Sequence, residues 1–194
     1  MKRLILASSS PYRARLLERL RIPFTTCAPN IDEQPNPSEA ADALAGRLSV
    51  AKTLAGAALQ RDEHSLIIGS DQVASCRGRL LGKPGTIEKA QQQLAWCAGN
   101  TVRFETGLAV FDSDTQTLLQ HTEPFEVRLR ALSEREIAHY VERDQPLDCA
   151  GSFRWESLGI ALFQGMSGHD PTALEGLPMI ALCSFLQDLG VEVL

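Results

Sequence analysis

The chain has 194 residues and is 44% hydrophobic, which is enough for one domain with a sizeable core or for two closely joined lobes. Nineteen basic and 24 acidic residues give a net charge of -5, and the basic residues are scattered, which argues against binding to long nucleic acids. The five cysteines are widely spaced with no CxxC pair, and no long apolar segment opens the chain. We therefore expect a cytoplasmic protein with free thiols and no membrane contact.

The first predicted elements are a strand and a helix joined by three serines. Residues 4–7 form an apolar run of strand length, and Ser10 followed by Pro11 is a favoured N-cap and first-turn pair. The helix N-terminus, the serine hydroxyls and the guanidinium of Arg13 together suit a phosphate group. An ordinary strand, cap and amphipathic helix explains the same residues equally well.

The next segment combines a loop and a long helix. Residues 24–28 resemble a short strand, and the proline-rich polar loop that follows carries Asp32 and Glu33. Ser38 is expected to cap a helix with leucines and alanines on one face. Lys52 flanks that apolar face, so its ammonium group could either extend to solvent or point into a cleft.

A third strand and a hairpin occupy the centre of the chain. Residues 66–68 are expected to form a buried strand of an α/β sheet, with Asp71 at its carboxyl end, where ligands collect in such sheets. A hairpin turning near Gly78 leads to Lys83. A helix is expected from about residue 86 to 98.

The second half mixes strands and helices. Residues 101–112 and 117–132 alternate in a way typical of antiparallel strands, and Ser133 with Glu136 forms a capping box for the helix that follows. The last helix is expected to begin at Pro178. The stretch from about 101 to 142 could form a smaller lobe, although no linker marks a boundary.

Carboxylates and cations stand out, all of them at the ends of elements or in loops except Lys52, which lies within a predicted helix. The acidic ones are Asp32, Glu33 and Asp71, and the basic ones are Arg13, Lys52 and Lys83. Hard divalent ions bind carboxylate and phosphate oxygens, while Arg and Lys offset the charge on phosphoryl groups, so this set suits metal-dependent phosphoryl chemistry. Asp71 could hold the metal or accept the proton of the attacking water, with Glu33 as a second ligand. Each residue alone is more often a solvated charge, so the hypothesis requires that they lie together.

Seven motifs carry a resemblance that spans nearly the whole chain: LASSSPYRARLL, IDEQ, VAK, GSDQV, GKP, PLDCAGSF and EGLP. In this order they resemble the Maf-like nucleoside triphosphate pyrophosphatases, which share an elongated α/β fold with the inosine triphosphatases. The resemblance implies a mixed sheet with flanking helices, a cleft between two lobes, and a homodimer. It also implies cleavage between the α and β phosphates, giving a nucleoside monophosphate and pyrophosphate.

The resemblance further assigns roles to individual residues. Asp71 would be the proton acceptor, and Glu33 with Asp71 would bind Mg2+ or Mn2+. The triphosphate would be bound by serine hydroxyls and cations at Ser8, Ser10, Arg13, Lys52 and Lys83.

Three positions depart from the common pattern of the family. Tyr12, Gln72 and Glu156 resemble the branch that hydrolyses 7-methyl-GTP. Methylation at N7 makes guanine cationic, which favours an aromatic ring and a carboxylate. Tyr12 or Trp155 could supply the ring, Glu156 could accept from the guanine edge, and Gln72 could bind a remaining polar group, although both aromatic side chains could simply pack. Ser157 stands where glycine is common in that branch.

Two other functions remain open at this point. The chain could prefer a pyrimidine triphosphate such as dTTP or UTP, or it could bind nucleotides as a regulator of cell division without turnover. The presence together of Asp71, Glu33 and Lys83 argues against an inactive protein.

Overall fold

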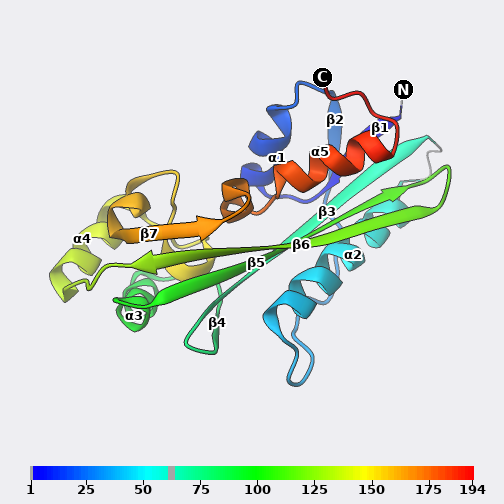
Figure 1. Cartoon of the computed structure of the whole chain (residues 1–194). Helices are drawn as coiled ribbons and strands as arrows, with labels where there is room; N and C mark the ends of the chain where they lie inside the picture. The colour runs from blue at the N-terminus through cyan, green and yellow to red at the C-terminus, as the bar shows by residue number, and fades with distance from the viewer. Residues whose placement is uncertain (1, 61–63) are drawn as a thin grey trace. The chain divides into compact units, whose positions relative to one another are not determined.

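The computed structural model describes residues 2–60 and 64–194 and has a mixed α/β fold (Figure 1). Its strands are β1 (Arg3–Ala7), β2 (Phe24–Cys27), β3 (Ser65–Cys76), β4 (Arg79–Leu81), β5 (Thr101–Asp112), β6 (Thr117–Leu129) and β7 (Phe163–Gly168). Its α-helices are α1 (Pro11–Glu18), α2 (Ala41–Leu59), α3 (Ile87–Cys97), α4 (Glu134–Asp144) and α5 (Met179–Asp188). Three short 3-10 helices are η1 (Ala150–Ser152), η2 (Leu158–Leu162) and η3 (Pro171–Glu175). Within the described ranges, no helix is both long enough and apolar enough to cross a membrane.

The strands of the described residues form one sheet in the order β2-β1-β3-β5-β6-β7, with β4 paired to β3. Strand β1 runs parallel to both of its neighbours, so that Leu4 lies opposite Phe24 on one side and Leu66 on the other. The β3–β4 and β6–β7 pairs are antiparallel. The predicted mixed sheet with flanking helices is therefore confirmed.

The chain divides into two compact units. Unit 1 comprises Met1–Gln72, Thr106–Glu123 and Asp170–Leu194, and unit 2 comprises Val73–Glu105 and Pro124–His169. The stretch 101–142 contributes to both units. Its assignment as a smaller lobe, and a cleft between two lobes, stay predictions.

Unit 1 is a three-layer arrangement because β1 and β3 are buried on both faces. Leu4 and Leu6 point to one face, where they pack with leucines of α1 and α5. Ile5 and Ala7 point to the other face, where Ala57 of α2 packs against them. Figure 1 shows the same division, with α1 and α5 on one side of these strands and α2 on the other.

Unit 2 packs helices and short turns around the remaining strand segments. Helix α3 packs against α4 and against η1. The ring of Phe153 makes edge-to-face contacts with Phe104 and Phe163, at centroid distances of 5.6 and 5.1 Å. Such aromatic pairs stabilise a small core beyond the area that they bury.

Most local signals of the sequence predict the observed element ends. Helix α1 begins at Pro11 with Ser10 as its N-cap, and the capping box of Ser133 and Glu136 is formed at α4. The hairpin turns at Gly78, which has a φ of +75°. The prediction for Ser38 is wrong, because α2 begins at Ala41 with Ala40 at the N-cap position, and Ser38 lies in the preceding turn with a φ of +61°.

The predicted end of the central strand is also wrong. Strand β3 continues through Asp71 to Cys76 instead of ending after Ile68. The strand continues because residues 74–76 pair with the antiparallel strand β4. Asp71 therefore lies in the middle of a long strand and is held on a rigid element.

Candidate active site

The centre of the candidate site is an ammonium group shared by two carboxylates. Lys52 Nζ lies 2.6 Å from Asp71 Oδ1 and 2.8 Å from Glu33 Oε1. The side chains of Lys52 and Asp71 are each 11% exposed, whereas that of Glu33 is 61% exposed. The structure therefore brings these three predicted residues together, and Lys52 points inward instead of extending to solvent.

Lys52 reaches Asp71 because helix α2 lies unusually close to the sheet. A Cβ atom at Gly69 would lie 2.7 Å from the backbone oxygen of Ser49 and from the backbone nitrogen of Thr53. Likewise, a Cβ atom at Gly107 of β5 would overlap the backbone of Ala45. Only glycine permits such an approach, so Gly69 of β3 and Gly107 of β5 set the distance between α2 and the sheet.

The loop that carries Glu33 is anchored by a bidentate ion pair. Arg47 of α2 donates to both carboxylate oxygens of Glu39, at 2.7 and 2.8 Å, and to the backbone oxygen of Gln34 at 3.0 Å. The Arg47 contact, with a backbone hydrogen bond from Asn36, lowers the pKa of Glu39 to about 2. Planar guanidinium–carboxylate pairs have a defined geometry, so this pair fixes the loop next to Glu33.

A second group of contacts surrounds Arg13 at the start of α1. Arg13 Nη1 donates to Ser8 Oγ at 3.2 Å, and its Nε donates to the backbone oxygen of Gly176 at 2.8 Å. The backbone nitrogen of Ser10 also donates to Ser8 Oγ, and the hydroxyl of Ser70 lies 2.8 Å from the same Gly176 oxygen. The first turn of α1, with its serine hydroxyls and a positive helix end, is a suitable place for an anion.

Two groups of residues interact electrostatically here. The Arg13 group is Arg13 with the contacts just described, and the Lys52 group is Lys52 with Asp71 and Glu33. Burial lowers the pKa of Arg13, and the negative charges of Asp71 and Glu33 oppose that shift. Four charged side chains, two cationic and two acidic, thus act on one region of unit 1. A polyphosphate bound here would meet a guanidinium and an ammonium at close range.

Tyr12 and Gln72 also lie in unit 1, but their polar and aromatic groups are partly engaged. Arg15 lies over the ring of Tyr12, 5.2 Å from its centroid. Gln72 Nε2 donates to the backbone oxygen of Ala173 at 2.6 Å. Both side chains are half-buried, so each keeps some surface to offer to a ligand.

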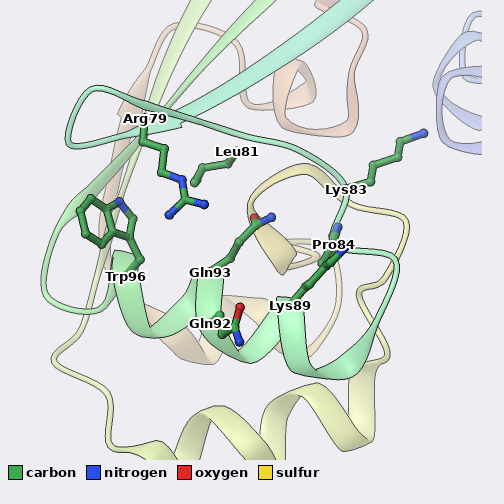
Figure 2. Close-up of a pocket in the computed structure, with 8 residues that line it drawn as sticks. All are labelled: Arg79, Leu81, Lys83, Pro84, Lys89, Gln92, Gln93 and Trp96. Atoms are coloured by element: carbon green, nitrogen blue, oxygen red, sulfur yellow. The ribbon is translucent and has the colours of Figure 1, made fainter.

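Lys83 lies in unit 2, in the loop between β4 and α3. It lines a pocket of about 240 Å³ together with Arg79 and Lys89. Figure 2 shows the guanidinium of Arg79 reaching toward α3, whereas the ammonium group of Lys83 extends away from that helix. Lys83 is exposed and therefore free to reach a negatively charged group.

Glu156 also belongs to unit 2 and is exposed. It lies in a tight turn in which the backbone nitrogen of Ser157 donates to the backbone oxygen of Arg154 at 3.3 Å. Trp155 is half-buried, and its Nε1 is a buried donor with no acceptor among the described residues. Whether Glu156 or Trp155 meets the base of a nucleotide stays a prediction.

Sequence reasoning missed several residues that support the site. Gly176 has a φ of +91° and offers its carbonyl to Arg13, and Ala173 offers its carbonyl to Gln72 and to Thr106. The EGLP motif contains Gly176, so a signal was present. Its meaning as a left-handed turn beneath Arg13 could not be derived from one sequence, because the contact joins residues far apart in the chain.

The donor set fits a divalent cation. Glu33 and Asp71 each place a carboxylate oxygen on the same ammonium group, and Asp71 Oδ2 has no hydrogen-bond partner in the part of the chain that the structure describes. Within residues 2–60 and 64–194, no group of three or more His, Cys, Asp or Glu side chains gathers at one point. Two carboxylates suit Mg2+ in particular, since it commonly takes its other oxygens from water and substrate phosphates.

The fold is of a known class. The solved structure of the Staphylococcus aureus Ham1 protein superimposes with a TM-score of 0.55 at 10% sequence identity, covering 97% of this chain and 100% of that one. At such low identity the likeness concerns the fold alone. The chain thus shares the mixed α/β fold of that protein.

Sequence comparison is more specific. The family model described as Maf-like protein matches residues 3–189, and the chain belongs to this family. A protein of Nitrosococcus oceani named 7-methyl-GTP pyrophosphatase is 50% identical over 191 residues, which is 98% of this chain and 95% of the relative. A Pseudomonas aeruginosa protein of the same name is 49% identical over 193 residues and is covered completely. The predicted family resemblance is confirmed.

Proposed function

We propose that the protein is a metal-dependent pyrophosphatase that hydrolyses 7-methyl-GTP to 7-methyl-GMP and pyrophosphate. The observation that carries this proposal is the shared contact of Glu33 and Asp71 with Lys52, beside the Arg13 group. The names of relatives at about half identity over nearly full length support the reaction and the substrate.

Each residue of the site has a distinct part in the proposed reaction. Arg13 and Lys52 bind phosphate oxygens and offset the negative charge that develops on them in the transition state. Asp71 Oδ2 accepts the proton of a water molecule as that water attacks the α-phosphorus, and the pyrophosphate leaves. Because Asp71 lies on a buried strand, it holds the water in a fixed direction.

The remaining parts concern the metal, the base and further phosphate contacts. Glu33 and Asp71 would hold Mg2+ or Mn2+, which when bound supplies positive charge to the phosphoryl oxygens. Ser8, Ser10 and Lys83 would add phosphate contacts. Selection of methylated guanine would rest on an aromatic face at Tyr12 and on polar groups of Gln72 and Glu156. A cytoplasmic homodimer belongs to the same proposal and is supported by the family resemblance alone.

The test is a pyrophosphate-release assay with 7-methyl-GTP, GTP, dTTP and UTP, each with Mg2+, Mn2+ or a chelator. We expect metal-dependent release of pyrophosphate, fastest with 7-methyl-GTP. Faster turnover of dTTP or UTP would replace the proposed substrate with a pyrimidine nucleotide. Nucleotide binding without any release would replace the enzyme with a binding protein.

Variants test the assigned roles. Asp71→Asn should lower kcat by about 10²–10⁴-fold, the usual contribution of a general base, while nucleotide binding by calorimetry is retained. Glu33→Gln should raise the metal concentration needed for half-maximal activity. Asp32→Asn is the matched control, because Asp32 is the neighbouring carboxylate and caps the backbone nitrogen of Gln34 instead of contacting Lys52. Full activity of Asp71→Asn would remove Asp71 from its role.

A further inference from the structure

The turn that presents Glu156 is tied to the C-terminal end of helix α4. Arg154 Nη1 donates to the backbone oxygen of Asp144 at 2.8 Å, and Nη2 donates to that of Gln145 at 3.1 Å. Nη2 also donates to Asp148 Oδ1 at 2.8 Å. The last carbonyls of a helix carry partial negative charge, so a guanidinium is a favourable partner there. The first residue of the turn is therefore fixed through its side chain.

A buried carboxylate fixes both ends of the same turn. Tyr140 Oη donates to Asp144 Oδ2 at 2.8 Å and accepts from the backbone nitrogen of Arg154 at 3.0 Å. Ser157 Oγ donates to Asp144 Oδ1 at 2.6 Å. Tyr140 and Asp144 are only 4% and 8% exposed. Burial raises the pKa of Tyr140, so its hydroxyl stays protonated and remains a donor.

The two residues in the middle of the turn have no such anchors. Trp155 Nε1 has no acceptor among the described residues, and Glu156 forms no hydrogen bond or ion pair in the described part of the chain. The direction of the Glu156 side chain therefore depends on the backbone of the turn. That backbone is held at Arg154 and at Ser157.

We propose that Tyr140 and Asp144 are positioning residues for base selection, because they hold the Arg154–Ser157 turn in the conformation that directs Glu156 at the base of the nucleotide. The inference rests on the proposed function. Ser157 belongs to the same positioning set, because its hydroxyl completes the contact to Asp144. This serine stands where the 7-methyl-GTP branch of the family commonly has glycine. Its φ is -127°, so the backbone at this position does not adopt the left-handed conformation that favours glycine.

The experiment compares kcat/KM for 7-methyl-GTP with kcat/KM for UTP in the full-length protein. Ser157→Ala and Tyr140→Phe should each lower this ratio by roughly tenfold, the usual effect of one lost hydrogen bond to a charged group. Ser157→Thr, which keeps the hydroxyl, should leave the ratio close to that of the wild type. His139→Gln is the control on the exposed side of the same helix and should leave the ratio unchanged.

A double variant separates positioning from general structural support. In a Glu156→Gln background, Ser157→Ala should leave the ratio where Glu156→Gln alone puts it, because the turn then has no carboxylate to direct. Equal losses for both nucleotides, or a further tenfold loss in the double variant, would overturn the inference. If Glu156→Gln abolishes the preference but Ser157→Ala and Tyr140→Phe retain it, the positioning role fails while the proposed function stands. If the wild-type protein does not prefer 7-methyl-GTP, the proposed substrate fails and the inference with it.

Discussion

Replacement of Lys52 by methionine tests whether the shared ammonium group holds the site together. Methionine keeps most of the aliphatic stem but removes the positive charge between Asp71 and Glu33. Asp71 would then be a nearly buried carboxylate without its close ion-pair partner. Breaking a buried pair from one side is costly, because the remaining charge is left desolvated.

The magnitude follows from the exposure of the two carboxylates. The pair of Lys52 and Asp71, each 11% exposed, belongs to the buried class, whose disruption costs about 3–5 kcal/mol. Glu33 is 61% exposed, so its contact with Lys52 contributes at most about 1 kcal/mol. We expect Lys52→Met to lower the free energy of unfolding by about 3 kcal/mol. With an m-value of about 2 kcal/mol/M, the urea midpoint falls by about 1.5 M.

The assay is urea unfolding at neutral pH without nucleotide or metal. Lys89→Met is the matched control, because Lys89 is exposed and has no ion pair in the described part of the chain. Adding Asp71→Asn to Lys52→Met should recover much of the loss, since an amide leaves no buried charge. A midpoint for Lys52→Met within about 0.2 M of the wild type, or a double variant no more stable than the single one, would refute the reasoning.

Two further predictions concern the elements around the site. Gly69→Ala should lower the free energy of unfolding by about 1–3 kcal/mol in thermal or urea unfolding, because the added methyl group meets the backbone of α2. Gly82→Ala is the control, and because open space surrounds Gly82 it should change the free energy of unfolding by less than about 0.5 kcal/mol. Equal effects of the two changes would contradict the close packing. In a carboxyl-detected NMR titration Glu39 should stay ionised until the pH approaches its pKa of about 2. The stability that this ion pair gives the loop is therefore complete above pH 4.5 and is lost as the pH falls toward 2. Arg47→Gln should return this pKa toward 4.5, and an unchanged titration in that variant would show that Arg47 is not the cause.

Features that depend on neighbouring residues could be predicted from the sequence. Ser10 before Pro11, and Ser133 three residues before Glu136, mark helix starts because capping is satisfied within one turn. Ser38 has the right residue type for a cap but lies in a turn with positive φ, and α2 starts without a side-chain cap. There the preceding loop is held by Arg47 of α2 through Glu39 and Gln34, a contact that no capping rule includes.

The site itself depends on contacts between distant residues, which limits prediction from one sequence. The direction of Lys52 follows from the close approach of α2 to Gly69, and not from its place beside an apolar stripe. Asp71 was expected at a strand end, whereas its strand continues through pairing with β4. The choice of Glu33 and Asp71 came from chemistry and family resemblance, and the structure shows that both carboxylates reach one ammonium group.

The central claim is that a nucleoside triphosphate binds where Arg13, Lys52 and Asp71 lie together. A crystal structure of the Asp71→Asn variant with 7-methyl-GTP and Mg2+ tests it most directly, because slow turnover would preserve the substrate. The account predicts phosphate oxygens in contact with Arg13 and Lys52, and the α-phosphate facing residue 71. A triphosphate bound elsewhere, with these three side chains still turned to one another, would contradict it.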